Sequence, residues 1–473
     1  MNDPVADLQQ YRYKWYAFAA AAIGVFMSTL DASIVNIGLP TFKQVFGAGL
    51  PTVQWVVMSY LLAITSVLLT LGRLGDMIGR RKVYVAGIVV FTVGSVLCGI
   101  SPSIHALIVS RALQGIGASM LMAMGPAITT AAFPSSERGR ALGMIGTVVA
   151  VGLTFGPAAG GYIIKYLGWR WIFFINVPVA VIGVPLIYRF LRESVVSREE
   201  KFDIPGAALL FFSLSCLLIA LSYGNDFGWA SWKTLALAAG FVTFGVLFIR
   251  WEQRVPNPVF HLELFRNKIF MLSSTAAYIS FISLFSVAVY MPFYLMQALE
   301  FSPVTTGQIL MLVPATMSFI APLSGWLSDK FGPRVLSSIG MATMSIGLFS
   351  LSRLGVKETA SDIIWRLLLA GIGSGIFQSP NTSAILGAVP RNMLGVASGM
   401  VAMMRNLGMV SGVALIGAVV SAQQAHYLSH SASASKAALV YGLQTGFLVA
   451  AGISIIGFII SAARGSSLEV RSG

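Results

Sequence analysis

The sequence predicts an all-α integral membrane protein whose chain crosses the bilayer fourteen times. Of its 473 residues, 56% are hydrophobic and only 10% are charged, whereas a soluble domain carries about a quarter charged residues. Apolar runs long enough to span a bilayer recur along the whole chain, and several motifs repeat between its two halves. A β-barrel is excluded, because period-2 alternation is absent and the runs are about twice as long as a barrel strand.

Each predicted membrane helix is a run of roughly 20 apolar residues, the length that spans the hydrocarbon core. Many runs contain Gly, Pro or Ser, which lipid-embedded helices tolerate because neighbouring helices satisfy the freed backbone groups. The first run is too long for a signal-peptide core and no small-residue cleavage site follows it, so we expect it to be retained. The runs lie near residues 15–39, 53–72, 83–100, 104–132, 141–163, 171–190, 206–224, 232–250, 269–298, 305–327, 335–352, 363–387, 395–421 and 441–463.

The basic residues predict the orientation of these helices. If the N-terminus is cytoplasmic, 21 of the 31 Lys and Arg residues lie in cytoplasmic segments and 7 lie in outer loops. Because cytoplasmic loops carry an excess of Lys and Arg, we expect both termini to be cytoplasmic and the protein to lie in the cell (inner or cytoplasmic) membrane. The net charge of +14 is then topological, and it is scattered rather than gathered on one face as in a nucleic-acid-binding protein.

An internal repeat divides the chain. The segments GRLGDMIGRRKV (72–83) and GWLSDKFGPRV (325–335) share Gly, Asp, Gly and Arg at an offset of 253, and a Gly-Ile-Gly triplet at 115–117 recurs at 371–373. Duplicated halves are common in transporters. We therefore expect two six-helix bundles with two further helices between them. The predicted units are residues 1–200, the first bundle; 201–255, the inserted pair; and 256–473, the second bundle.

The motifs together resemble a known family. In chain order they are LDASIVNIGLP (30–40), GRLGDMIGRRKV (72–83), LIVSRALQGIGAS (107–119), GLTFGPAAGG (152–161), WRWIFFINVP (169–178) and RNLGMVSGVALIGA (405–418). The sequence is similar to the fourteen-helix drug:proton antiporter branch of the major facilitator superfamily, the QacA/EmrB-like multidrug exporters. The resemblance covers nearly the whole chain and implies the major facilitator fold with a 6+2+6 arrangement of helices.

Asp31 is the only carboxylate well inside a predicted span, where an ionised group costs roughly 2.5–3.5 kcal/mol to insert. With helix 1 ending at Pro40 and helix 4 starting near Ser103, Asp31 and Arg111 both lie roughly 12–13 Å below the outer surface. Gln114 shares the helical face of Arg111. The resemblance implies that helices 1 and 4 line the cavity, so we expect these three side chains at the cavity. We expect Asp31 to take up and release the coupled proton beside Arg111, as the resemblance also implies for the helix-4 arginine. The alternatives are a permanent ion pair that only joins two helices and an Asp31 side chain bonded to nearby backbone.

The repeated motif between helices 2 and 3 is a candidate cytoplasmic gate. If its turn is helical, the oppositely charged side chains at positions 76 and 80 face each other. In the resembled superfamily this motif braces the gate and must release for inward opening. A role in the positive-inside rule alone explains the basic residues but not the spacing of Gly and Asp. The gate residues are Gly72, Asp76, Gly79, Arg80 and Arg81, with Asp329 in the second half.

Glycines at a spacing of four in the outer half of helix 5 predict a flat face for close helix packing, bent by a proline. The resemblance associates this signature with antiporters, and a purely packing role is the alternative. It is the main reason to expect export rather than uptake. The motif residues are Gly152, Gly156, Pro157, Gly160 and Gly161.

Other polar residues within or beside the spans are less informative. Arg405 lies near the middle of helix 13 without an acidic partner on that helix, and is a candidate substrate contact. His426 and His430 form an i, i+4 pair without a third ligand, so no metal site is expected. Cys98 and Cys216 both lie inside apolar runs and do not form a disulfide framework.

We expect a proton-driven exporter of small amphipathic compounds that works by alternating access, with the proton gradient as its energy source and no cofactor. Its expected partners are the small-molecule substrate, protons and the lipid bilayer, and the sequence leaves open whether a periplasmic adaptor takes part. A single membrane acid argues against efficient export of dications. Uptake by proton symport is the alternative from the same fold. A membrane-embedded enzyme is a distant third, because the sequence has no metal-ligand cluster, nucleotide-binding loop or nucleophile constellation.

Overall fold

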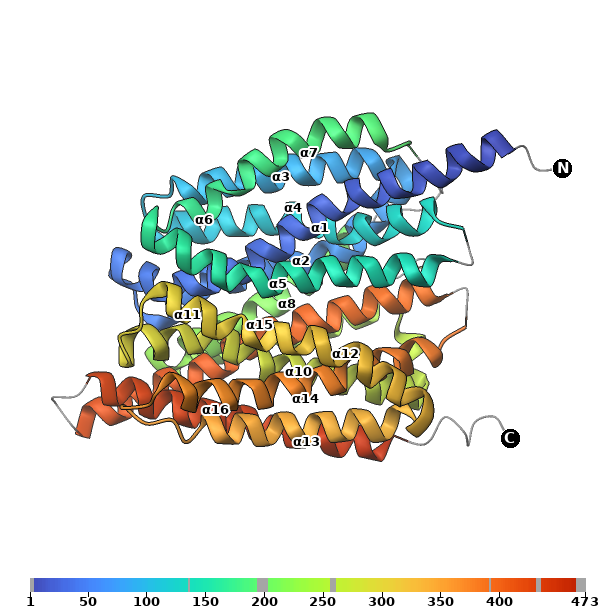
Figure 1. Ribbon diagram of the computed structural model, residues 1–473. Coiled ribbons are helices and arrows are strands. Elements are labelled where there is room, and N and C mark those ends of the chain that lie inside the picture. Colours follow the sequence, from blue (N-terminus) through green and yellow to red (C-terminus); the bar gives the residue numbers. More distant parts are fainter. Residues whose placement is uncertain are drawn as a thin grey trace.

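The computed structural model describes residues 4–134, 137–193, 203–255, 261–390, 393–430 and 435–464. All regular structure in these residues is helical, and fourteen of the helical segments are long and apolar enough to cross a membrane. The helices lie roughly along one direction in an elongated bundle (Figure 1). The predicted all-α membrane fold with fourteen spans is therefore confirmed.

The first six spans are continuous helices except for the sixth, which breaks at Ile175. They are α1 (Pro4–Phe46), α2 (Leu50–Ile78), α3 (Arg80–Gly99), α4 (Ile104–Ala132), α5 (Arg138–Tyr166) and α6 (Trp171–Phe174) followed by α7 (Asn176–Phe190). Spans seven and eight are α8 (Ile204–Phe227) and α9 (Trp232–Glu252).

A short helix, η2 (Leu262–Arg266), leads into the last six spans. Two of these spans are composite: one ends in a π-helical turn and the next breaks at Met311. The six are α10 (Lys268–Phe293) with η3 (Tyr294–Ala298), α11 (Pro303–Leu310) with α12 (Leu312–Phe331), α13 (Pro333–Leu351), α14 (Ala360–Gly387), α15 (Leu394–His430) and α16 (Ser435–Ala463).

The two six-helix groups repeat the same helix contact. Helix α3 crosses α4 where Gly117 lies against the backbone of Phe91, and α13 crosses α14 where Gly373 lies against the backbone of Met344. A Cβ atom at either glycine would collide with those backbone atoms. The Gly-Ile-Gly triplets that reveal the repeat in the sequence therefore mark positions where only glycine permits the observed helix spacing.

The inserted pair packs at the boundary between the two groups. Helix α8 contacts α2 and α15, and α9 packs mainly against α8. Asn225 on α8 donates to the backbone carbonyl of Ala418 at 2.9 Å, and the hydroxyls of Tyr223 and Thr52 lie 3.5 Å apart. Helix α8 thus touches both groups, while much of α9 presents apolar side chains outward.

Helix α1 is longer than the sequence predicts. The prediction that it ends at Pro40 is wrong, because the helix continues to Phe46 with Pro40 inside it. Beyond the proline, Phe42 is fully buried and packs edge-on against Trp169 at 5.3 Å between ring centroids. This aromatic packing compensates for the one backbone hydrogen bond that proline removes. The depth of Asp31 calculated from Pro40 is therefore not valid.

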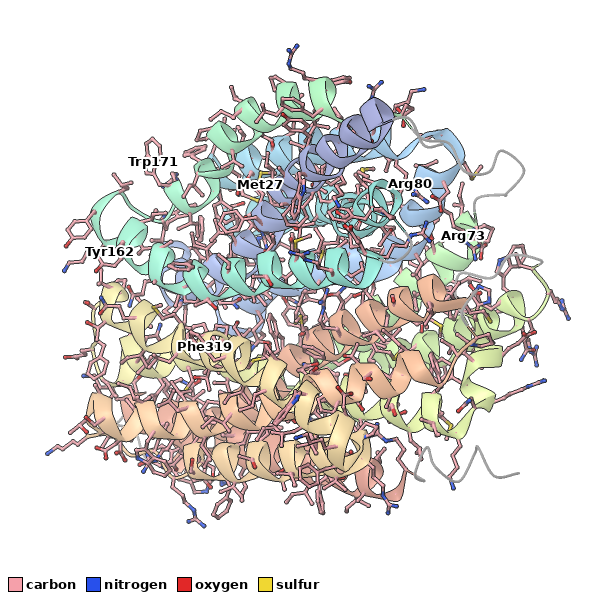
Figure 2. All side chains as sticks on the ribbon, turned by 45° about the vertical axis from the view of Figure 1, so that its right-hand side comes forward. Met27, Arg73, Arg80, Tyr162, Trp171 and Phe319 are labelled. Carbon is pink, nitrogen blue, oxygen red and sulfur yellow. The ribbon has the colours of Figure 1, made fainter. Side chains whose placement is uncertain are left out.

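The two ends of the bundle differ in their side chains. Helix α1 begins and α16 ends at the same end, which we name the termini end, and the opposite end is named the far end (Figure 1). Figure 2 shows Arg73 and Arg80 toward the termini end, and Tyr162 and Trp171 toward the far end. This arrangement fits the predicted orientation with cytoplasmic termini, which stays a prediction.

The two groups are packed together at the far end. A Cβ atom at Gly161 on α5 would collide with the Pro303 backbone, and one at Gly307 on α11 would collide with the Pro157 carbonyl. Toward the termini end, Gly143 and Gly146 on α5 have no atom within 4 Å of an added Cβ. The structure is therefore closed at the far end, and α5 has an unpacked glycine face at the termini end.

The orientation can be measured with single cysteines in a variant that lacks Cys98 and Cys216. Gln44 is exposed at the far end and Lys330 is exposed at the termini end. With cytoplasmic termini, Gln44→Cys should react with a membrane-impermeant maleimide in intact cells, and Lys330→Cys only after permeabilisation. The reverse pattern would show that the termini are outside.

The role of the repeated glycines can be measured with two Gly→Ala variants. Gly117→Ala should lower the free energy of unfolding by about 1–3 kcal/mol, because its Cβ overpacks the α3–α4 contact. Gly143→Ala is the matched control in open space and should leave stability unchanged or raised, because Ala favours helix by about 1 kcal/mol. Thermal unfolding in detergent compares the two, and equal melting temperatures would contradict this account.

Candidate functional site

A cavity of about 310 Å³ lies between the two helix groups. Its walls come from α1, α2, α4 and α5 on one side and from α10, α11, α12, α14 and α15 on the other. Most of the lining is apolar, and no Asp or Glu of the described residues contributes to it. The larger polar side chains in the wall are Asn36, Tyr60, Arg111, Gln378, Arg405 and Asn406.

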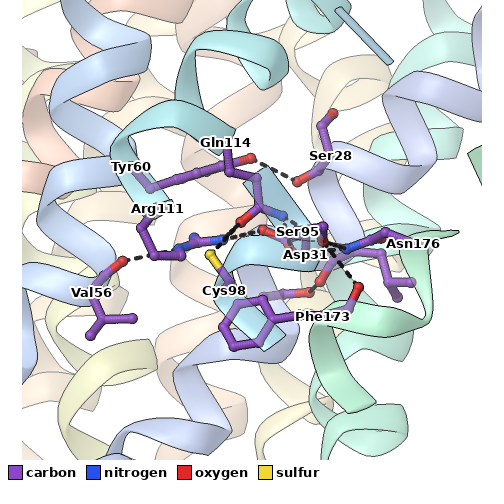
Figure 3. A network of polar contacts seen from close by, with 12 residues as sticks. Ser28, Asp31, Val56, Tyr60, Ser95, Cys98, Arg111, Gln114, Phe173 and Asn176 are labelled. Atoms are coloured by element: carbon purple, nitrogen blue, oxygen red, sulfur yellow. Dashed lines mark hydrogen bonds and ion pairs between the residues drawn. The ribbon is translucent and has the colours of Figure 1, made fainter. Parts of the chain in front are cut away.

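An ion pair lies at the first-half wall of this cavity. Arg111 Nη1 on α4 lies 2.5 Å from Asp31 Oδ2 on α1, and both side chains are at most 1% exposed (Figure 3). A buried charge without a partner is costly, so the ion pair stabilises both charges at this depth. The pair that the sequence expected from matching depth is present, although the helix end used to calculate that depth is wrong.

Neutral polar groups complete the coordination of Asp31. Its Oδ1 accepts hydrogen bonds from Gln114 Nε2 at 2.9 Å and from Asn176 Nδ2 at 3.1 Å. The Ser95 hydroxyl accepts from the same two amides, at 3.0 and 2.8 Å, and donates to the Phe173 carbonyl. The network thus joins α1, α3, α4 and the junction of α6 and α7 (Figure 3).

Arg111 has further partners besides Asp31. Its Nε donates to the Val56 carbonyl at 3.1 Å and its Nη1 to Gln114 Oε1 at 2.6 Å. The guanidinium carbon lies 4.1 Å from the centroid of the Tyr60 ring, a cation–π distance. Arg111 therefore keeps several favourable contacts when the charge of Asp31 changes.

The structure corrects one expectation about the candidate proton site. Arg111 lines the cavity, but Asp31 and Gln114 do not, because they are buried behind its wall. Asn176 and Ser95 are site residues that the sequence analysis missed. Asn176 lies in the WRWIFFINVP motif, and the structure places it next to the break between α6 and α7. An amide within this apolar run is the sequence feature that could have identified it.

The glycines of α5 contact the helix that carries Asp31. Added Cβ atoms at Gly152, Gly156 and Gly160 would collide in turn with Thr29, Ser33 and Ile34 of α1. The Ser33 hydroxyl donates across this contact to a carbonyl of α5 at 3.1 Å. The fourth glycine of the motif, at position 161, instead faces α11 of the other group, and the proline at 157 lines the cavity. The motif therefore links α1, the cavity and the closed far end.

The candidate gate motif forms the junction of α2 and α3. Asp76 Oδ1 lies 2.8 Å from Arg80 Nε, and Arg80 also donates to the Ala127 carbonyl of α4 at 3.1 Å. The loop expected over 73–82 is almost entirely helical, because both helices extend to Gly79, whose φ of 112° suits glycine. Gly72 approaches α4 without a clash.

The second basic residue of the motif is also paired within the first group. Arg81 Nε lies 3.6 Å from Glu193 Oε2, and its backbone N–H donates to the same carboxylate at 3.1 Å. In the second group, Asp329 is exposed and forms no ion pair with any described residue. The two copies of the motif therefore differ in their interactions.

The second-half arginine predicted to contact substrate does reach the cavity. Arg405 on α15 is half-buried in its wall, and no described residue forms an ion pair or hydrogen bond with its guanidinium. His426 and His430 are exposed, and the described residues contain no group of three potential metal ligands. The two cysteines are free thiols in this structure.

Comparisons with known proteins identify the family. Residues 21–413 match the model of the Major Facilitator Superfamily. The chain is 36% identical to the riboflavin transporter RibZ of Clostridioides difficile, covering 95% of this chain and 97% of that one. It is 32% identical to the multidrug resistance protein Stp of Mycobacterium tuberculosis, covering 85% and 75%. It is 30% identical to the tetracenomycin C resistance and export protein of Streptomyces glaucescens, covering 86% and 76%.

Solved structures share the fold. A bacterial homologue of the human lysosomal transporter Spinster superposes with a TM-score of 0.72 at 15% identity, covering 96% of this chain and 97% of that one. The xylose transporter XylE of Escherichia coli gives 0.63 at 14% identity, covering 95% and 97%. The family match and the similar transporters confirm the resemblance to drug-efflux members of the major facilitator superfamily, and they indicate a transporter rather than an enzyme. The chain is a multi-pass transporter of the cell membrane and belongs to the major facilitator superfamily.

Proposed function

We propose that the protein is a proton-coupled antiporter that exports small, mainly apolar compounds by alternating access. The observation that carries this proposal is the adjacency of the central cavity to the buried Asp31–Arg111 pair. The cavity can hold a compound between the two helix groups. The ion pair places a single carboxylate, that of Asp31, behind the wall of this cavity. The names of Stp and of the tetracenomycin C export protein support drug export.

The proposed proton step takes place at the Asp31 carboxylate. A proton on Asp31 removes the negative charge that holds Arg111 Nη1, while Arg111 keeps its bonds to Val56 and Gln114. The tie between α1 and α4 is then weakened without leaving the guanidinium unsolvated. Release of the proton restores the ion pair and the original packing of α1.

The proposed conformational step exchanges which end is closed. In this structure α5 contacts α11 at the far end, and the glycine face of α5 around Gly143 is unpacked at the termini end. With cytoplasmic termini, the far end is the outer end, and it is the end that is closed in this structure. Closure of the termini end would pack that free glycine face and separate α5 from α11 at the far end.

The proton gradient is the proposed energy source, and no cofactor is needed. One proton that moves inward releases about 2.3 kcal/mol per 100 mV, before the pH difference is added. An exchange of one proton for one molecule therefore supports modest accumulation outside. Protons and the exported compound are the proposed partners, and an adaptor protein is not part of the proposal.

Proton-coupled uptake is a second candidate function, and one observation favours it. The chain matches the riboflavin transporter RibZ over nearly the full length of both proteins. Uptake would use the same cavity and the same carboxylate, with proton and solute bound in the same state. The two candidates therefore differ in the direction of coupled flux and not in the site.

The role of Asp31 can be tested with Asp31→Asn. The variant should lose proton-driven uphill transport but retain counterflow, which exchanges labelled for unlabelled substrate without a gradient. The asparagine amide can still bond to its neighbours, so the folded protein should be recovered by size-exclusion chromatography. Asp226→Asn, at an exposed site outside the network, is the matched control and should transport normally. Undiminished uphill transport by Asp31→Asn would refute the coupling role.

The direction of coupling can be measured in inside-out vesicles. The test compound is the best substrate from an efflux screen in a pump-deficient host. An exporter that exchanges protons for this compound should accumulate it when the vesicle lumen is acidified, because the lumen corresponds to the outside. Release of preloaded compound under the same gradient would instead establish symport.

A further inference from the structure

Arg405 carries the unbalanced charge of the cavity. The other arginine in the wall, Arg111, is neutralised by Asp31 at 2.5 Å. Arg405 forms no ion pair or hydrogen bond with any residue that the structure describes, and no described Asp or Glu lines the cavity. The space between the helix groups is therefore positively charged and has an unused guanidinium in its wall.

Unsatisfied amide groups lie in the same wall. Asn406, beside Arg405 on α15, is 2% exposed, and its Nδ2 has no hydrogen-bond partner among the described residues. Asn36 on α1 is 5% exposed, and its Oδ1 is likewise unpartnered. Buried polar atoms are normally hydrogen-bonded. Arg405 and both amides belong to the wall of one cavity, so its lining includes a guanidinium and an amide donor that no described residue uses.

The rest of the cavity selects for apolar bulk. Phe281, Phe285, Met317 and Met409 form part of its lining. Its volume of about 310 Å³ lies at the lower end of the range for small-molecule pockets. Aromatic and methionine side chains contact flat or irregular apolar surfaces well. A suitable ligand is therefore compact, ring-containing and mostly apolar.

We propose that Arg405 and Asn406 recognise a single anionic group on such a compound, with the apolar remainder held by the aromatic and methionine side chains. The proposal rests on the proposed function to the extent that this cavity carries the transported compound. Charge-assisted hydrogen bonds from a guanidinium are about twice as strong as neutral ones. Cations meet an uncompensated positive charge at the same place, so they bind weakly.

The test uses the full-length protein in lipid nanodiscs at neutral pH without a gradient. Three probes share one ring system and differ in charge: pyrenebutyrate, pyrenebutanol and pyrenebutylammonium. Binding is measured by energy transfer from tryptophan to pyrene. The anion should bind about tenfold more tightly than the cation. Arg405→Gln should lower the affinity for the anion by about tenfold and change the affinity for the alcohol by no more than about twofold.

Three variants keep the test independent of folding. Arg405→Lys retains the charge and should retain the preference for the anion over the cation. Arg353→Gln removes an exposed arginine that lies outside the cavity and should change none of the three affinities. Asp31→Asn removes the charge that balances Arg111, so it should raise the affinity for the anion and lower the affinity for the cation. Melting temperatures confirm that each variant is folded.

Equal affinity of the wild-type protein for all three probes would overturn the inference. An Arg405→Gln variant that still prefers the anion would also overturn it, as would an Arg405→Lys variant that has lost the preference for the anion. Binding without a gradient separates this result from the proposed function. If the protein prefers the anion but shows no proton-driven flux, the proposed function is contradicted and this inference stands. Proton-driven flux of cations by a protein without anion preference would remove this inference alone.

Discussion

The buried ion pair between Asp31 and Arg111 constrains the whole first half of the protein. Two opposite charges deep in a membrane protein are tolerated only if each is fully coordinated. Asp31 meets this requirement with three other helical segments. Its carboxylate bonds to Arg111 and Gln114 of α4 and to Asn176 of α7, and Ser95 of α3 holds the two amides in place. The packing of these segments is therefore set by the charge at their centre.

Glycine allows the helices to come close enough for this network and for the closure of the far end. Gly117 permits α3 to cross α4, and Gly156 permits α5 to approach α1. The same residue type leaves α5 bare near Gly143, where no partner is present in this structure. A helix with glycine on both its packed and its unpacked segments can exchange one contact for another with little steric cost, because no large side chain has to be repacked.

The sequence predicts the fold well because its signals are strong and repeated. Apolar runs, basic loops and duplicated glycine motifs each reflect a physical requirement of the lipid bilayer, and that requirement applies to every span of the chain. Asp31 and Arg111 were predicted to pair because charges in apolar runs need partners. Asn176 and Ser95 were missed because neutral polar residues in membrane helices are ordinary, and only the break between α6 and α7 brings the amide to Asp31. The extension of α1 beyond Pro40 depends on aromatic packing with distant residues, which a local pattern does not contain.

The charge of the transported compound determines how coupling can work. A proton on Asp31 leaves Arg111 unbalanced at the cavity wall, which attracts an anion and repels a cation. Electrostatic repulsion between the bound proton and a cationic substrate therefore suits the exchange of protons for cations. A bound proton instead strengthens the binding of an anion, so the two would bind together in the same state. An exporter of anions must couple through helix packing instead. In the proposed exporter, helix α1 would provide that route, because it carries Asp31 and its Ser33 and Ile34 lie against the glycines of α5, the helix that closes the far end. Loss of the ion pair would free α1 to shift, and α5 would move with it.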